Sequence, residues 1–227
     1  METTTQQRKT NKQKRQPKGA ITFNLQLNEE QKLAKAVILE NSITVLTGKA
    51  GSGKTLLACQ VALDMMFTRQ AERIIISRPA ITSEDLGFMP GGLKDKMDPY
   101  LEPIYHNMYR LYNRPKIDKM MEEGEIEIGP VGFMRGKTFV DSVVIVDEAQ
   151  NVTDHQMLTI LTRVGKGSKL IICGDSTQKD LKRNIKSGFM DAIEMSARIN
   201  DFGIFELQNN HRAGIVDDVI EWYANNR

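Results

Sequence analysis

Short apolar runs alternate along this chain with longer stretches that have helical periodicity. Five runs have the length and the aliphatic, β-branched character of buried strands. They are Ile43–Leu46, Ile74–Ser77, Val143–Val146, Leu170–Cys173 and Gly203–Leu207. The helical stretches are Glu29–Glu40, Gly53–Thr68, Pro99–Tyr112, Asp154–Val164, Ser187–Arg198 and Ile215–Asn225. This alternation predicts a three-layer α/β fold, in which helices cover both faces of a mainly parallel sheet. Because such sheets bind ligands at the carboxyl ends of their strands, we expect the chemistry directly after strands.

The turn after the first predicted strand carries a phosphate-binding pattern. Its residues fit G-x-x-x-x-G-K-[ST] and run directly into the next predicted helix. They are Gly48, Lys49, Ala50, Gly51, Ser52, Gly53, Lys54 and Thr55, followed by Leu56. Glycines let the backbone N–H groups turn toward an anion, and the helix N-terminus adds a partial positive charge. In such loops the lysine reaches the β- and γ-phosphates and the hydroxyl ligates Mg²⁺. Residues 48–56 are therefore predicted to bind a nucleoside triphosphate.

Two carboxylates follow the aliphatic run Val143–Val146. Asp147, at the strand tip, would hold Mg²⁺, and Glu148 would act as general base on the attacking water. The alternative is a strand that ends in an ordinary acidic loop. Since the same chain carries the phosphate loop, we interpret the pair as a Walker B motif.

Two glutamines are candidate nucleotide contacts. Gln178 ends the segment GDSTQ, where its amide would hydrogen-bond the γ-phosphate or the attacking water, with Asp175 orienting it or supporting the metal. Gln31, in the segment LNEEQ, would read the edge of adenine. The alternative for Gln31 is a solvated side chain on a helix that Asn28 caps. The sequence has no Asn-Lys-x-Asp segment of the kind associated with guanine, so ATP is favoured over GTP.

The formal net charge of +2 hides an asymmetry. Residues 1–19 hold six basic side chains against Glu2 alone and lack large apolar residues after Met1, which predicts a basic disordered tail. Such a tail is either an arm that neutralises phosphates or a solubilising leader. Cys59 and Cys173 fall inside predicted core elements, which favours buried thiols in a reducing, cytoplasmic compartment. No run approaches the ~18 apolar residues of a membrane span.

The segment 78–140 is predicted to be a functional insertion, because loops of this length in a compact domain usually carry function. Four of its apolar residues have helical spacing, namely Tyr105, Met108, Tyr109 and Tyr112. This spacing favours core packing, although aromatics beside Lys and Arg also suit stacking against single-stranded nucleic acid. Residues Glu125–Pro130 alternate in polarity and predict a half-buried strand, with a hairpin to Val131–Met134 as a further expectation.

Taken together, the motifs LNEEQ, GKAGSGKT, DEAQN and GDSTQ resemble the first motor domain of superfamily one helicases. The segments SRPA (77–80), LGFMPG (86–91), DPYL (98–101) and MRGKT (134–138) resemble the PhoH-like family of P-loop ATPases more closely. The resemblance covers roughly residues 20–225. It implies one RecA-like ATPase domain over residues 20–227 with Mg²⁺-ATP as ligand, and action as an RNA helicase or RNA-remodelling factor. The matching positions for nucleotide chemistry are Lys54, Thr55, Asp147, Glu148 and Gln178.

Superfamily one helicases enclose ATP between two RecA-like domains, whereas this chain holds one such domain. An arginine that stabilises transition-state charge is worth ~10³–10⁵ in turnover, and a neighbouring copy would supply it in a closed head-to-tail ring. We therefore expect a homo-oligomeric ring, with a hexamer as the first candidate. The candidate arginines, in descending order, are Arg212, Arg135, Arg183 and Arg163.

Three functions compete at this point. The first is an ATPase coupled to single-stranded RNA or DNA, the second a P-loop kinase that phosphorylates a small acceptor, and the third a nucleotide-dependent binding switch with little turnover. The carboxylate pair and the GDSTQ segment suit activation of water, which favours hydrolysis over a kinase. A switch without turnover has no need of Glu148 as a base.

Overall fold

Six parallel strands form the sheet at the centre of the molecule, in the order β3-β2-β4-β5-β1-β6. The computed structural model describes residues 22–79, 93–134, 136–182, 184–209, 214, 215, 219 and 222 of the 227. The strands are β1 (Ile43–Gly48), β2 (Arg73–Arg78), β3 (Ile126–Pro130), β4 (Ser142–Val146), β5 (Lys169–Gly174) and β6 (Phe202–Leu207). The predicted α/β fold with a parallel sheet is confirmed.

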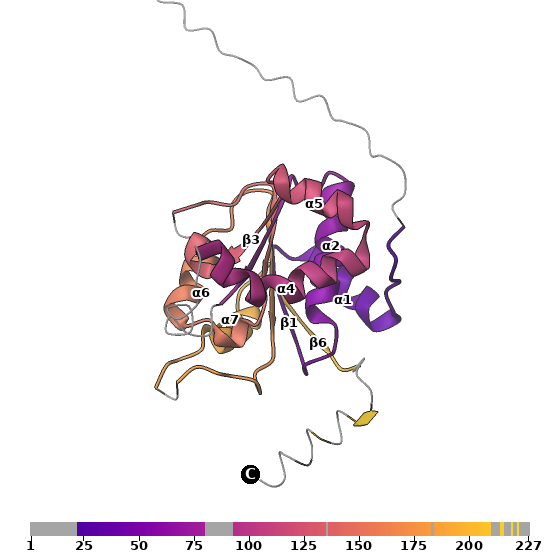
Figure 1. Cartoon of the computed structure of the whole chain (residues 1–227). Helices are drawn as coiled ribbons and strands as arrows, with labels where there is room; N and C mark the ends of the chain where they lie inside the picture. Colours follow the sequence, from indigo (N-terminus) through magenta and orange to yellow (C-terminus); the bar gives the residue numbers. More distant parts are fainter. Residues whose placement is uncertain are drawn as a thin grey trace, which may run out of the picture.

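Helices cover both faces of this sheet (Figure 1). One face carries α1 (Glu29–Glu40), α2 (Lys54–Phe67), α4 (Leu93–Leu111) and α5 (Arg114–Glu122). The other carries α6 (Asp154–Leu161), α7 (Gly188–Ser196) and the 3₁₀ helices η1 (Val131–Met134) and η2 (Ala149–Asn151). Alternate residues of the central strands enter the two cores: in β4, Ile145 packs on the α2 side and Val146 on the α7 side. Both faces of the central strands are therefore buried.

Helix α1 begins where the sequence predicts, because its first turn is capped reciprocally. Asn28 Oδ1 accepts a hydrogen bond from the Gln31 N–H at 2.8 Å, and Gln31 Oε1 accepts one from the Asn28 N–H at 3.1 Å. This capping box satisfies two backbone donors that the helix itself leaves unpaired. The predicted cap at Asn28 is confirmed, and it fixes the Gln31 side chain against the helix.

The segment 78–140 differs most from its prediction. The strand expected at Glu125–Pro130 is confirmed as β3, but it joins the main sheet parallel to β2. The expected hairpin with Val131–Met134 is wrong, since these residues form η1. Val131 and Met134 are both buried in the second core, and their spacing of three matches the 3.0 residues per turn of a 3₁₀ helix.

Helix α5 is absent from the prediction, although its signals are local. Asn113 caps it, and Pro115 occupies its first turn, where a missing N–H costs nothing. From the sequence, these residues belong to the insertion 78–140, with no helix predicted there. Helix α4 begins at Leu93 rather than at Pro99, and α6 ends at Leu161 rather than at Val164.

Side chains of α4, and Tyr112 directly after it, pack into the first core as their helical spacing predicts. Met108 is fully buried, and Tyr105, Tyr109 and Tyr112 are partly buried against the same cluster. The core-packing interpretation of these aromatics is therefore confirmed.

The remaining predictions concern the cysteines, a membrane span, the N-terminal tail and the last helix, and only some of these residues are described by the structure. Cys59 and Cys173 are both buried and free, as predicted. None of the helices in the described part of the chain combines the length and apolar character that a membrane span requires. The predicted tail over residues 1–19 lies outside the described residues, as does most of the helix predicted at 215–225.

Candidate functional site

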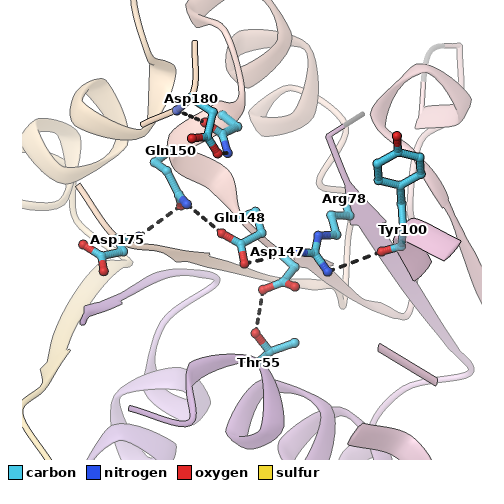
Figure 2. A network of polar contacts seen from close by, with 9 residues as sticks. Thr55, Arg78, Tyr100, Asp147, Glu148, Gln150, Asp175 and Asp180 are labelled. Atoms are coloured by element: carbon cyan, nitrogen blue, oxygen red, sulfur yellow. Dashed lines mark hydrogen bonds and ion pairs between the residues drawn. The ribbon is translucent and has the colours of Figure 1, made fainter. Parts of the chain in front are cut away.

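Polar side chains from four strands meet at the carboxyl edge of the sheet (Figure 2). The loop of residues 48–55 follows β1, Arg78 ends β2, Asp147 follows β4, and Asp175 follows β5. Since these strands are parallel neighbours, their ends lie at one edge, where ligands of open α/β sheets bind. The sequence-predicted motifs are thus brought together by the sheet.

The phosphate-loop backbone turns into α2 at Gly53, whose φ of 84° lies in the left-handed region that favours glycine. The Lys54 ammonium donates to the carbonyl oxygens of Gly48 at 2.7 Å and Lys49 at 3.0 Å. The Ala50 N–H donates to the Asp175 carboxylate at 2.9 Å. The loop is therefore tied both to its own lysine and to the turn after β5.

A short hydrogen bond joins the phosphate loop to the residue that follows β4. Thr55 Oγ1 donates to Asp147 Oδ1 at 2.6 Å, and the Asp147 backbone N–H extends the β2–β4 ladder by donating to the Ser77 carbonyl at 2.8 Å. Asp147 is only 5% exposed. Burial raises the pKa of its carboxyl, and the Glu148 charge adds to this, while the Thr55 hydroxyl and Arg78 oppose it.

Thr55 and Asp147 fit a Mg²⁺ ion by their chemistry. A hydroxyl and a carboxylate oxygen are hard donors of the kind Mg²⁺ takes alongside water and phosphate oxygens. A buried carboxylate whose ionised form is disfavoured gains from a cation at this place. These two residues would hold the ion, and the Gly53–Lys54–Thr55 turn would hold the phosphates.

The Glu148 carboxylate lies between Arg78, at the end of β2, and Gln150, in η2 (Figure 2). Its backbone is left-handed, with a φ of 51°, which is uncommon for a residue other than glycine and turns the chain sharply from β4 into η2. Its Oε1 lies 3.3 Å from Arg78 Nη2, and its Oε2 accepts from Gln150 Nε2 at 2.6 Å. Gln150 Oε1 in turn accepts from the Asp175 N–H at 3.1 Å.

The turn after β5 is organised by Asp175. Its Oδ1 accepts from both the N–H and the hydroxyl of Thr177, and its carbonyl accepts from the Gln178 N–H at 3.1 Å. The Gln178 side chain is exposed at the rim of the site. Two residues further on, Asp180 exchanges hydrogen bonds with Asn151 at 2.8 and 3.1 Å, which ties this loop to η2.

Gln31 directly follows Glu30, which binds the segment after β6 that borders the phosphate loop. Glu30 accepts from the Gln208 N–H at 2.6 Å and from the Asn209 N–H at 3.2 Å, and Leu207 pairs with Gly48 in the sheet. Gln31 itself is 6% exposed and is held by the capping box. It is therefore a buried capping side chain and not a solvated one, and its contact with adenine stays a prediction.

Of the four arginines proposed to act on a neighbour's nucleotide, only Arg163 lies among the described residues. Arg135, Arg183 and Arg212 fall outside them. The Arg163 carbonyl accepts from the Phe139 N–H at 2.9 Å, shortly before β4 begins. Arg163 thus lies at the amino edge of the sheet, opposite the phosphate loop of its own chain.

Two residues of the polar network, Arg78 and Gln150, stand in the SRPA and DEAQN segments but were given no role from the sequence. Arg78 has a signal in hindsight, since it ends β2 beside the strand that carries Asp147. Gln150 has a weaker one, as the amide that follows the carboxylate pair by two residues. Arg78 lies 70 positions before its partner Glu148, and Gln150 lies 25 positions before its partner Asp175, so these two contacts depend on how the strands are arranged.

The parallel sheet, the loop between β1 and α2, and the carboxylate at the tip of β4 define a P-loop nucleotide-binding protein. The family model described as "PhoH-like protein" matches residues 25–224. The chain belongs to the PhoH-like protein family.

Curated relatives agree with this assignment. The PhoH-like protein of Bacillus subtilis is 42% identical over 191 residues, which cover 83% of this chain and 60% of the relative. The PhoH-like protein of Mycobacterium tuberculosis is 42% identical over 189 residues, 81% of this chain and 53% of the relative. The chain thus spans about half the length of the curated relatives it matches. Among solved structures, the UvsW helicase from bacteriophage T4 is similar in fold, with a TM-score of 0.51 and 14% identity over 79% of this chain and 59% of that one.

The buried charge at Asp147 has a testable consequence for stability. Its pKa is raised in the folded chain, so the folded state binds this proton more tightly than the unfolded state does. Stability is then lost as the pH rises from the ordinary carboxyl pKa of about 4 through the raised one. Without Mg²⁺ and nucleotide, Asp147→Asn should raise the free energy of unfolding at pH 7 by on the order of 1 kcal/mol. Urea unfolding at pH 7 and at pH 4 measures this, and the gain should shrink at pH 4.

The control for this measurement is Glu122→Gln, which neutralises an exposed carboxylate on α5. Its effect should stay within about 0.5 kcal/mol at both pH values. An Asp147→Asn variant that is no more stable than the wild type at pH 7 would contradict the account of Asp147 as a destabilising buried charge.

Proposed function

We propose that this chain binds ATP with Mg²⁺ and hydrolyses it, and that hydrolysis is coupled to single-stranded nucleic acid. The observation that carries the proposal is the 2.6 Å contact between Thr55 Oγ1 and Asp147 Oδ1, with Glu148 next in the chain. This contact joins a phosphate-binding turn, a pair of metal-type oxygen donors and a candidate base within one site. Those are the parts that phosphoryl transfer to water needs.

Each residue has a physical task in this scheme. Lys54 exchanges the loop carbonyls that it now contacts for phosphate oxygens, and Thr55 with Asp147 holds the ion. An Mg²⁺ ion held by these two residues would supply positive charge against the negative charge that develops on the phosphate oxygens. Glu148 accepts a proton from the attacking water. Gln178, at the exposed rim of the site, orients that water or contacts the γ-phosphate.

Preference for ATP rests on Gln31. Its position on α1, directly after Glu30, puts it on the β1–β6 side of the phosphate loop. Because Oε1 already accepts a hydrogen bond from Asn28, the Nε2 group is the better candidate for a base contact. The Glu30 carboxylate accepts hydrogen bonds from the backbone N–H groups of Gln208 and Asn209, which ties α1 to the segment after β6.

Coupling to single-stranded nucleic acid has two supports. The fold is similar to that of a helicase. In addition, Lys179, Lys182 and Lys186 are exposed on the loop after β5. Lys179 donates to the Ile185 carbonyl and Lys186 pairs with Asp191, so these two would exchange a protein partner for a nucleic-acid phosphate. The Asn151–Asp180 pair connects that loop to η2, directly after Glu148. A single-stranded nucleic acid bound on this loop would therefore lie near Glu148, the candidate general base.

A homo-oligomeric ring, in the first instance a hexamer, would complete the site by supplying an arginine in trans. Arg163 lies at the edge opposite its own phosphate loop, so it could serve only a neighbour's nucleotide. Arg212, Arg135 and Arg183 remain the other candidates. Sedimentation velocity under turnover conditions tests the ring. We expect an ATP-dependent assembly, and a monomer with full ATPase activity contradicts the proposal.

The hydrolysis proposal is tested by steady-state phosphate release from Mg²⁺-ATP. Glu148→Gln should lower kcat by about 10²–10⁴-fold, because the amide cannot take the proton, while ATP binding persists. Glu125→Gln, an exposed carboxylate before β3, is the control and should turn over at the wild-type rate. Single-stranded RNA and single-stranded DNA, added separately, should show which of them raises kcat.

Other outcomes of that assay separate the alternatives. ATP binding by the wild type without turnover, with or without either strand, would favour the nucleotide-dependent switch. Turnover that requires a small-molecule acceptor would favour the kinase. Turnover that is indifferent to Glu148 contradicts the assignment of the base.

A further inference from the structure

Arg78 makes two contacts that connect the candidate base with another part of the fold (Figure 2). Its Nη2 lies 3.3 Å from Glu148 Oε1, and its Nη1 donates to the Tyr100 carbonyl at 3.3 Å. The Arg78 side chain is 21% exposed and the Glu148 side chain 38%. The planar guanidinium presents donors in a fixed fork, so both contacts depend on one orientation of one side chain.

Both oxygens of the Glu148 carboxylate have a protein donor in this arrangement. Arg78 is beside Oε1, and Gln150 Nε2 donates to Oε2 at 2.6 Å. A general base must turn an oxygen toward the water that it deprotonates, at hydrogen-bonding distance. Water therefore competes with Arg78 and Gln150 for the carboxylate, and the observed orientation is a resting one.

The second contact of Arg78 leads to helix α4. Tyr100 belongs to α4, and this helix packs against α2, whose first two residues are Lys54 and Thr55. Arg78 is thus a bridge from the base to a helix of the 78–140 segment. Because one guanidinium serves both acceptors, the orientation of the Glu148 carboxylate is tied to the position of the Tyr100 carbonyl.

We propose that Arg78 is a positioning residue that holds the Glu148 carboxylate in its resting orientation and ties it to α4 through the Tyr100 carbonyl. This inference rests on the proposed ATP hydrolysis and deepens it. It assigns to the 78–140 segment a role in controlling the base.

The first test compares kcat and KM for ATP in the wild type, Arg78→Ala and Arg78→Lys, without nucleic acid and at saturating Mg²⁺. Arg78 also favours the ionised form of Asp147, by lowering the pKa of its carboxyl. Saturating Mg²⁺ keeps a change in metal affinity from affecting the comparison. Both variants should raise kcat by about two- to fivefold, the range for an ion pair of this exposure, and leave KM within about twofold. Loss of a purely structural contact would lower kcat instead.

The Arg78→Lys variant shows whether the two hydrogen bonds of the guanidinium matter or only its positive charge. Lysine keeps the positive charge but has no fork, so it should behave as the alanine variant does. The control is Arg73→Ala, at the other end of β2, which removes an exposed arginine 3.6 Å from Glu127. It should leave kcat unchanged. A fall in kcat in Arg78→Ala, or a lysine variant with wild-type kcat, overturns the proposal.

A second readout does not depend on turnover. Hydrogen–deuterium exchange of residues 100–111 reports the stability of α4. Arg78→Ala and Glu148→Ala should both raise the exchange rate there, because each removes one end of the bridge, whereas Arg73→Ala should not. Equal exchange in all variants overturns the proposal. If the wild type shows no turnover, the proposed hydrolysis fails, and this second readout alone decides the role of Arg78.

Discussion

Parallel strand pairing is the constraint on which the site depends. Thr55 and Asp147 lie 92 positions apart in the chain, yet their side-chain oxygens are 2.6 Å apart. The sheet achieves this because β4 and β1 both pair with β5 in the same direction, so their carboxyl ends share one edge. The aliphatic residues of these strands are buried on both faces, and their burial holds the register. Polar groups that follow the strands are consequently positioned by the apolar residues that precede them.

The same edge concentrates charge that the fold would otherwise avoid. Asp147 and Asp175 are both nearly buried, and Glu148 is half-buried beside Arg78. Buried polar groups are costly unless hydrogen-bonded, and here each carboxylate has donors: Thr55 for Asp147, Ala50 and Thr177 for Asp175. The network is therefore rigid on the β5 side. On the β2 side the network depends on one long side chain, that of Arg78, which contacts both Glu148 and the Tyr100 carbonyl.

Much of the architecture follows from local patterns in the sequence. Five of the six strands stand at apolar runs, and the α1 cap at Asn28 and the phosphate loop follow from residue type and spacing. Helix α5 and η1 were missed or misassigned because a proline in a first helical turn, and an apolar pair three residues apart, are ambiguous without knowledge of what they pack against. The roles of Arg78 and Gln150 were not predictable for a different reason. Their contacts depend on which strands are neighbours, and the order β2-β4-β5 cannot be derived from the chain order alone.

The central claim is that Thr55 and Asp147 together hold Mg²⁺ for a nucleotide on the phosphate loop. Calorimetric titration of ATP with and without Mg²⁺, for the wild type and for Thr55→Val, tests it most directly. Valine keeps the shape of threonine but removes the hydroxyl oxygen. The account requires that Mg²⁺ tightens ATP binding in the wild type by about tenfold or more, equivalent to ~1.4 kcal/mol, and has little effect in the variant. Equal tightening in both proteins, or a wild type that does not bind ATP, would contradict it.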